Sequence, residues 1–114
     1  MTTPSSRRDF DRFRVDIAPE RDTVRVTPVG ELDLATVSQL DDQLRELRQA
    51  GFRRFVLDLR ELLFMDSAGL RLILRFDARA REDAIDVALI AGSPAVQRVF
   101  EVSGTLELLT FRSS

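Results

Sequence analysis

The feature that most constrains this chain is a hydrophobic run that leads to Asp66 and Ser67 and is followed by an amphipathic segment. Residues 54–59 favour a strand, and residues 70–81 carry apolar side chains at helical spacing. Asp66 and Ser67 are therefore predicted on a strand-to-helix turn. At a helix start, backbone N–H groups lack intrahelical acceptors and the helix dipole favours negative charge. Ser67 then has two interpretations: it caps the helix, or it displays a hydroxyl for phosphorylation.

The composition excludes most forms of autonomous catalysis. The chain has no cysteine and no histidine, so thiol chemistry, the usual general base and the commonest metal ligand are missing. A Ser-His-Asp triad cannot be built around Ser67. The 17 basic residues are all arginine, which removes lysine chemistry, and the 19 acidic residues contain no pair whose spacing marks an acid/base couple. We therefore expect no enzyme activity, no metal and no cofactor.

Size and charge indicate one domain in the cytoplasm. The chain has 114 residues and a net charge of −2, which gives no general reason to expect nucleic-acid binding. No apolar run approaches the ~20 residues that a membrane span needs, and the polar N-terminus is not a signal peptide. Residues 1–11 lack periodicity and are predicted to be a flexible tail, which leaves residues 12–114 as the domain.

The N-terminal part of the domain predicts a β-hairpin. Residues 13–17 and 23–27 each alternate apolar and polar side chains, and the segment between them carries turn residues. Pro28 cannot donate a ladder hydrogen bond, so we expect it on an exposed side of the second strand or at its irregular end.

The first helix is predicted from apolar spacing and from its ends. Asp33 and Thr36 are alternative N-caps, and Gly51 is suited to a left-handed C-terminal position. The apolar face consists of Val37, Leu40, Leu44 and Leu47.

The second helix carries an arginine stripe opposite its apolar face. Arg71, Arg75 and Arg79 follow one another at i, i+4 spacing. Such charge runs usually form a solvated face. If the helix takes part in partner binding, however, the stripe could meet acidic residues of that partner.

The C-terminal part predicts a strand over residues 85–91, a third helix and a last strand over residues 106–111. Ser93 is the expected N-cap of that helix, Pro94 its first residue and Gly104 its end. The element order predicts an α/β sheet that is parallel in its second half and has a hairpin at one edge. The loops that carry Asp33, Ser67 and Ser93 should then meet at the carboxyl ends of the strands.

Three separated motifs resemble those of the STAS-domain anti-anti-sigma factors of bacteria. They are residues 30–33 (GELD), residues 64–70 (FMDSAGL) and residues 93–100 (SPAVQRVF) with Gly104. The resemblance covers residues 13–111. It implies the STAS fold, a single mixed β-sheet covered by about three helices.

The resemblance also implies a function. In this family the serine that corresponds to Ser67 is phosphorylated by a partner that is both anti-sigma factor and serine kinase. The unphosphorylated protein binds that partner and frees the sigma factor, and a serine phosphatase resets the cycle. The helix start should accept the phosphate, so that phosphorylation blocks docking without refolding the domain. The implied partner-binding residues are Asp33, Asp66, Ser67, Ala68, Gly69, Leu70, Ser93 and Pro94.

The chain departs from the family pattern at two places. Ala68 stands where a second serine often follows the phosphoacceptor. Ser67 is therefore the single candidate for phosphorylation in this motif. The terminal helix that is common after the last strand has no room here. Oligomeric state stays open between a monomer and a weak dimer.

Two alternatives remain beside the switched regulator. One is a STAS interaction module of a transporter or signalling assembly, in which Ser67 is only a cap. The other, a serine hydrolase, is disfavoured because Met65 occupies the position where a G-x-S-x-G elbow needs its first glycine.

Overall fold

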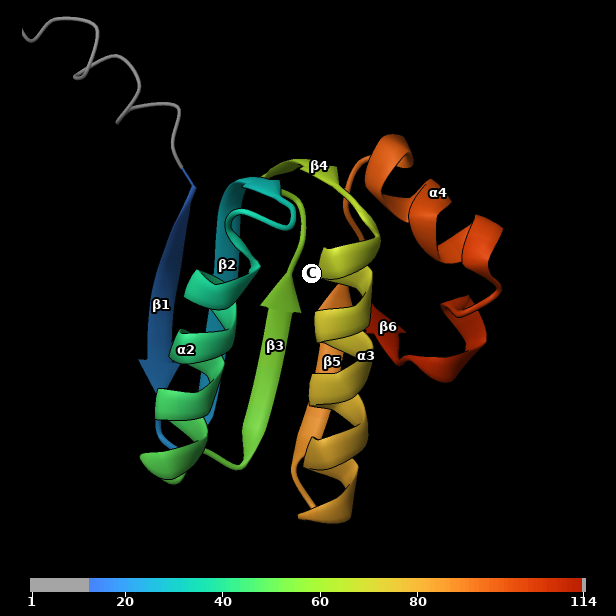
Figure 1. The fold of residues 1–114 in the computed structure, drawn as a ribbon. Coiled ribbons are helices and arrows are strands. Elements are labelled where there is room, and N and C mark those ends of the chain that lie inside the picture. Colours follow the sequence, from blue (N-terminus) through green and yellow to red (C-terminus); the bar gives the residue numbers. More distant parts are fainter. Residues whose placement is uncertain (1–12, 114) are drawn as a thin grey trace, which may run out of the picture.

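The computed structural model describes residues 13–113, which form one mixed β-sheet and three α-helices (Figure 1). The predicted α/β class and single mixed sheet are confirmed. The predicted tail, residues 1–11, lies outside the described residues. The elements are β1 (Arg14–Glu20), β2 (Thr23–Leu32), α2 (Val37–Gln49), β3 (Arg54–Asp58), β4 (Leu62–Met65), α3 (Ser67–Glu82), β5 (Asp86–Ile90), α4 (Pro94–Ser103), the 3₁₀ turn η1 (Leu106–Leu108) and β6 (Phe111–Arg112).

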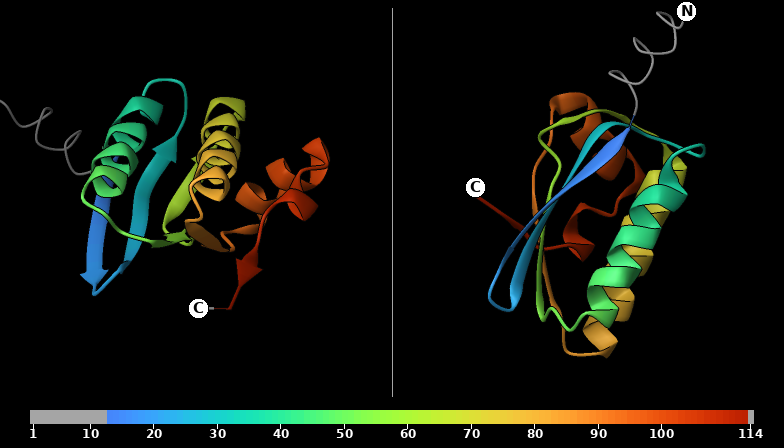
Figure 2. Two further views of the ribbon diagram at one scale, coloured as in Figure 1. Left: turned by 90° about the horizontal axis from the view of Figure 1, so that it is seen from below. Right: turned by 90° about the vertical axis from the view of Figure 1, so that its left-hand side faces the viewer.

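The sheet joins an antiparallel hairpin to a set of parallel strands. Its hydrogen-bonded order is β1-β2-β3-β5-β6, and the short β4 pairs with the end of β2. Among residues 13–113, the β1–β2 pair is antiparallel and the other strand pairs are parallel. α2 and α3 lie side by side over one face of the sheet, whereas α4 lies next to β4 and also contacts α3 (Figures 1 and 2). Because β2, β4 and β5 all run parallel within the sheet, the loops that follow them lie at the same edge, as predicted.

The ends of α2 and α4 follow the predicted turn chemistry. Gly51 comes just after α2 in a left-handed conformation (φ 100°), and Gly104 ends α4 at φ 74°. Ser93 caps α4, because its Oγ accepts the backbone N–H of Val96 at 3.3 Å, and Pro94 begins that helix. These local signals are sufficient to locate both ends.

Pro28 does not end β2. The strand continues to Leu32, and Pro28 is buried opposite Val15 of β1. On its other edge β2 pairs with β3 only as far as Val26 and with β4 only from Gly30. Pro28 lies in the gap between these two ladders, so a residue without an N–H group is tolerated inside the strand.

The sequence does not predict β4, and its position depends on the buried carboxylate of Asp58. Asp58 Oδ1 accepts the backbone N–H of Arg60 at 3.1 Å and its Nε at 2.9 Å, and Oδ2 accepts Nη2 at 2.8 Å. Arg25 of β2 adds an ion pair at 3.5 Å. These contacts close a tight turn after β3, and the chain then pairs with the end of β2 as β4.

The predicted strand over residues 106–111 is wrong. Leu106–Leu108 form η1, and only Phe111–Arg112 pair with β5. Leu106 and Leu108 are exposed, whereas Leu109 is buried. In this apolar run only Leu109 packs into the core, and it anchors the turn that precedes it. The apolar composition therefore does not indicate a strand here.

Gly69 lets the start of α3 lie directly against the ends of β2 and β4. A Cβ at this position would lie 2.8 Å from Cγ of Leu32 and 2.8 Å from Cγ of Met65. Both of these side chains are buried in a close-packed core, so neither has space to retreat. This close approach fixes where the first turn of α3 meets the edge of the sheet.

Replacing Gly69 by alanine should destabilise the fold. We expect Gly69→Ala to lower the free energy of unfolding by about 1–3 kcal/mol, because overpacking outweighs a propensity gain of about 1 kcal/mol. Urea denaturation measures the difference. Ala78→Gly, at an exposed position of the same helix, isolates the propensity term and should cost about 1 kcal/mol. A Gly69→Ala protein that is as stable as the original would contradict the steric account.

Acid should weaken the Asp58 turn. Hydrogen bonds from Arg60, with the charges of Arg60 and Arg25, hold the pKa of Asp58 below its ordinary value of 3.8, although burial opposes this shift. Because the pKa is lower in the folded chain than in the unfolded chain, the stabilisation is present above pH 3.8 and is lost as the pH falls through the depressed pKa.

Asp58→Asn should therefore remove part of the acid sensitivity of the fold. We expect a loss of about 1 kcal/mol in unfolding free energy at neutral pH, a value kept small because Arg60 is partly solvated. The difference between the two proteins should shrink in urea titrations below pH 3.8. Asp86→Asn, which removes an exposed carboxylate paired with Arg54, is the control and should change stability by less than about 0.5 kcal/mol. A constant difference across the pH range would contradict the assignment.

Candidate functional site

The carboxylate of Asp66 organises the strand-to-helix turn. Asp66 lies between β4 and α3 in an extended conformation and is the N-cap of α3. Its Oδ1 accepts the backbone N–H groups of Ala68 and Gly69 at 2.9 and 3.1 Å. Two of the N–H groups that a helix start leaves without partners are thereby satisfied.

Of the two interpretations of Ser67, the one in which its side chain caps the helix is wrong. Ser67 is instead the first residue of α3, its side chain is exposed, and among residues 13–113 its hydroxyl forms no hydrogen bond. Aspartate and serine are both favoured at N-caps, so residue type alone does not decide which of Asp66 and Ser67 is the cap. The residue at which β4 ends decides it. Met65 pairs with Leu32 of β2, which ends the strand there and makes Asp66 the next residue available as the cap.

Asp66 also connects the helix to the loop that follows β2. Its Oδ2 accepts the backbone N–H of Leu34 at 3.2 Å, and its own N–H donates to the carbonyl of Leu32 at 3.1 Å. One residue therefore holds the start of α3 against the start of the Asp33 loop.

Asp33 caps the turn that precedes α2. Its Oδ1 accepts the backbone N–H groups of Ala35 and Thr36 at 3.0 and 3.2 Å. Thr36 is the residue at the N-cap position of α2, and its hydroxyl donates to the carbonyl of Glu31 at 2.7 Å. Of the two alternatives left open by the sequence, the helix thus begins after Thr36, while Asp33 rigidifies the loop before it.

The predicted partner-binding residues on α3 divide into exposed and buried ones. Ser67 is exposed and Asp66 is half-buried, whereas Ala68, Gly69 and Leu70 are buried. Ala68 and Leu70 are only 9% and 7% exposed, so they hold the helix on the core. The surface available at this end of α3 is therefore Ser67 together with Asp66.

The Ser93-Pro94 turn lies at the same edge of the sheet without bonding to Asp66. Ser93 is half-buried and Pro94 is exposed. The turn is held close to the sheet, since a Cβ on Gly92 would lie 2.7 Å from the carbonyl oxygen of Leu59. Within the described residues, no hydrogen bond joins it to Asp33 or Asp66.

The sequence does not predict the exposed apolar side chains that precede Ser67 on β4 and in the loop after β2. Leu34 is 76% exposed, and its N–H is the one bonded to Asp66. Leu63 and Phe64 of β4, which leads directly into Asp66, are 76% and 47% exposed. Exposed large apolar side chains are typical of docking surfaces. The sequence does not predict their exposure, because β4 is too short to be recognised as a strand. Its burial pattern also does not alternate, since two consecutive residues are exposed.

The arrangement displays a hydroxyl but supplies no group to activate it. The carboxylate of Asp66 already accepts three backbone N–H groups, from Leu34, Ala68 and Gly69, and is oriented by them. No cluster of three potential metal ligands occurs in the described part of the chain. Among residues 13–113, none of the helices combines the length and the apolar character that a bilayer crossing requires.

Comparison with known proteins identifies the family. Residues 13–110 match the family model described as "Mlab, STAS domain". BtrV of Bordetella bronchiseptica, named as a candidate anti-sigma factor antagonist, is 35% identical over 85 residues, which cover 75% of this chain and 73% of that protein. The chain belongs to the STAS-domain family of anti-sigma factor antagonists. The anti-sigma-B factor antagonist of Staphylococcus aureus is 31% identical over 80 residues, covering 70% of this chain and 74% of that protein.

Solved structures of the family share the fold. The anti-sigma factor antagonist SpoIIAA in its unphosphorylated form is 27% identical, with a TM-score of 0.73 over 90% of each chain. The phosphorylated form of the Bacillus SpoIIAA matches at a TM-score of 0.68, with 26% identity over 90% of this chain and 93% of that one. The predicted STAS fold is thus confirmed.

Mutation of Asp66 should separate its role from that of Ser67. Asp66→Ala removes the cap and the bond to Leu34, so we expect a loss of about 1–2 kcal/mol in unfolding free energy. Ser67→Ala removes no hydrogen bond and should change it by less than about 0.5 kcal/mol. Urea denaturation gives both values, and amide hydrogen exchange should be faster at Leu34 in Asp66→Ala alone. Equal losses in the two variants would restore Ser67 as a capping residue.

Proposed function

We propose that this chain is a switched regulator that binds an anti-sigma factor with serine kinase activity and thereby frees a sigma factor. Phosphorylation of Ser67 by that partner ends the binding, and a serine phosphatase restores it. In this proposal the chain acts in the cytoplasm and is a regulator and a kinase substrate with no catalysis of its own.

The exposed, unbonded hydroxyl of Ser67 carries the proposal. A kinase can reach it without unfolding α3, because Asp66 supplies the cap and Ser67 is not needed for it. Exposed apolar contact area is available at Leu34, whose N–H bonds to Asp66, and at Leu63 and Phe64 of β4, the strand that leads into Asp66. SpoIIAA, a relative solved in unphosphorylated and phosphorylated forms, supports phosphorylation as the means of control.

A phosphate on Ser67 would not be bound by the first N–H groups of α3. The N–H groups of Ala68 and Gly69 already bond to Asp66, so a phosphate on Ser67 finds these donors occupied. It would lie in water next to a carboxylate and add about −1.5 to −2 charges there. The fold tolerates this because Ser67 is exposed. A docked partner, in contrast, has to desolvate both the phosphate and Asp66.

A charge at position 67 should block binding without disturbing the core. A penalty of about 3–4 kcal/mol corresponds to a loss of roughly two to three orders of magnitude in affinity. We therefore expect immobilised wild-type protein to capture an anti-sigma factor from the native cytosol, and Ser67→Asp to fail. Backbone amide spectra of Ser67→Asp should differ from wild type only around the start of α3 and the Asp33 loop.

Ala78→Asp is the matched control for this experiment. It adds the same charge at another exposed position of α3 and should capture as much partner as wild type. The captured partner, supplied with ATP, should add one phosphate to wild type and none to Ser67→Ala. If Ser67→Ala were still phosphorylated, or Ser67→Asp bound as well as wild type, the switch would be assigned to the wrong residue.

The interaction module without a switch is the weaker alternative. In that alternative Ser67 serves only as a cap, whereas the side chain that caps α3 is that of Asp66. Its remaining support would be copurification with a transporter or signalling assembly that is indifferent to both Ser67→Ala and Ser67→Asp.

A further inference from the structure

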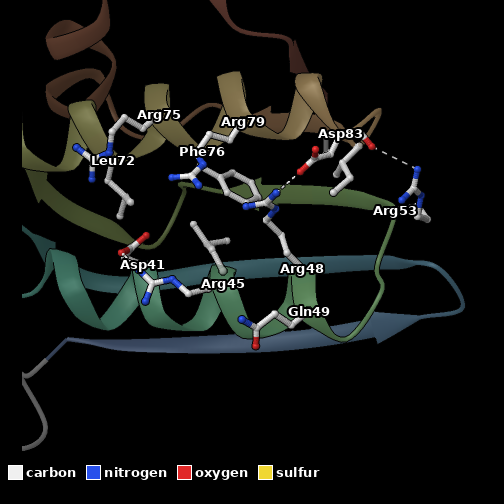
Figure 3. Close-up of a pocket in the computed structure, with 12 residues that line it drawn as sticks. Asp41, Arg45, Arg48, Gln49, Arg53, Leu72, Arg75, Phe76, Arg79 and Asp83 are labelled. Carbon is white, nitrogen blue, oxygen red and sulfur yellow. Dashed lines mark hydrogen bonds and ion pairs between the residues drawn. The ribbon is translucent and has the colours of Figure 1, made fainter.

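A groove of about 710 Å³ separates α2 from α3 (Figure 3). Its base is apolar and consists of buried side chains from both helices, among them Leu44, Leu72 and Phe76. Its walls are strongly basic. The arginines that line this α2–α3 groove are Arg45 and Arg48 from α2, Arg53 from the following loop, and Arg75 and Arg79 from α3.

Three of these arginines have partners within the fold. Arg45 Nη2 donates to Asp41 Oδ2 at 2.6 Å. Arg48 forms an ion pair with Asp83 across the groove, drawn as a dashed line in Figure 3. Arg53 donates to the carbonyl oxygen of Asp83 at 3.4 Å. These bonds hold positive charge at the rim of the groove.

Arg75 and Arg79 have no such partner among residues 13–113. They lie one helical turn apart on α3, are exposed, and form no ion pair or hydrogen bond among the described residues. Figure 3 shows the Arg79 guanidinium next to Phe76 and the Arg75 guanidinium near Leu72. Arg48 also keeps a spare donor, because its Nε is buried without an acceptor.

The arginine stripe of α3, which the sequence predicts to be a solvated face, therefore lies partly outside the groove and partly along it. Arg71 is exposed and does not line the groove, whereas Arg75 and Arg79 do. The groove is lined by five arginines and two aspartates, Asp41 and Asp83, and a third carboxylate, that of Asp42, pairs with Arg45 from outside it at 3.9 Å. Positive charge is thus in excess here, although the net charge of the chain is −2. Clustered like charges repel one another, so an anion in the groove would be favourable.

We propose that the α2–α3 groove binds a small linear oligophosphate, held between Arg75 and Arg79 on α3 and Arg45 and Arg48 on α2. The planar guanidinium fork matches phosphate oxygens bidentately. Arg75 and Arg79 are about 6 Å apart along the helix, a span that suits a chain of two or three phosphates better than a single one. The volume is that of an ordinary small-molecule site. Neither Ser67 nor Asp66 lines the groove, so the inference stands apart from the proposed switch.

Tripolyphosphate tests this site directly. In buffers of matched ionic strength it should raise the melting temperature of the full chain saturably and give a one-site isotherm by calorimetry. The arginine Nε–H resonances of residues 75 and 79 should shift along the titration. Tetraglutamate, an anion without phosphate geometry, should bind at least roughly tenfold more weakly.

Variants locate the binding. The double substitution Arg75→Gln with Arg79→Gln should weaken tripolyphosphate binding by roughly tenfold or more, and without ligand it should be at least as stable as wild type, because repulsion is relieved. Arg71→Gln, on the same stripe but outside the groove, should bind within about twofold of wild type.

The source of the phosphate chain follows from a second probe. A nucleoside triphosphate that binds more tightly than tripolyphosphate supports a nucleotide lying on the apolar base, and equal affinity supports an inorganic chain. The inference is overturned by unsaturable melting shifts, by tetraglutamate binding as tightly as tripolyphosphate, or by Arg71→Gln losing as much affinity as the double variant.

Discussion

The carboxylate of Asp66 is the interaction on which the site depends. Its two oxygens bond to backbone N–H groups from two separate segments, the first turn of α3 and the loop after β2. A serine at that position has one side-chain oxygen and could not serve both segments in this way. The acidic residue thus caps the helix start, and the neighbouring hydroxyl of Ser67 is left exposed and without a hydrogen bond among residues 13–113.

Asp66 is the N-cap of α3 because β4 ends at Met65. The buried carboxylate of Asp58 turns the chain after β3 and brings β4 alongside the end of β2. Met65 then pairs with Leu32, and Gly69 lets α3 lie against both side chains. Loss of any of these contacts would displace the first turn of α3 from the sheet edge, although all four of these residues are buried. The geometry of the candidate site therefore depends on buried contacts below the surface that carries Ser67.

The sequence predicts those features of the molecule whose causes are local. The three helices follow from apolar spacing and from turn residues such as Gly51, Ser93 and Gly104, and the hairpin follows from alternation. The failures involve partners distant in the chain. Whether Asp66 or Ser67 caps α3 depends on the pairing of β4 with β2, and the oxygen of Asp66 that bonds Leu34 spans 32 residues. The basic groove is equally hidden, because only the packing of α2 beside α3 brings its arginines together.

The two surfaces on α3 differ in position as well as in charge. Ser67 occupies the end of the helix, and Arg75 lies two turns further along its flank, about 12 Å away at the rise of an α-helix. This exceeds the Debye length of about 8 Å at physiological ionic strength, so solvent largely screens a phosphate on Ser67 from the groove. An anion in the groove would likewise have little direct electrostatic effect at the helix start. Any coupling between the two would have to run through a movement of α3 itself, and Gly69 opposes such a movement because it seats the helix between Leu32 and Met65 with no space to spare.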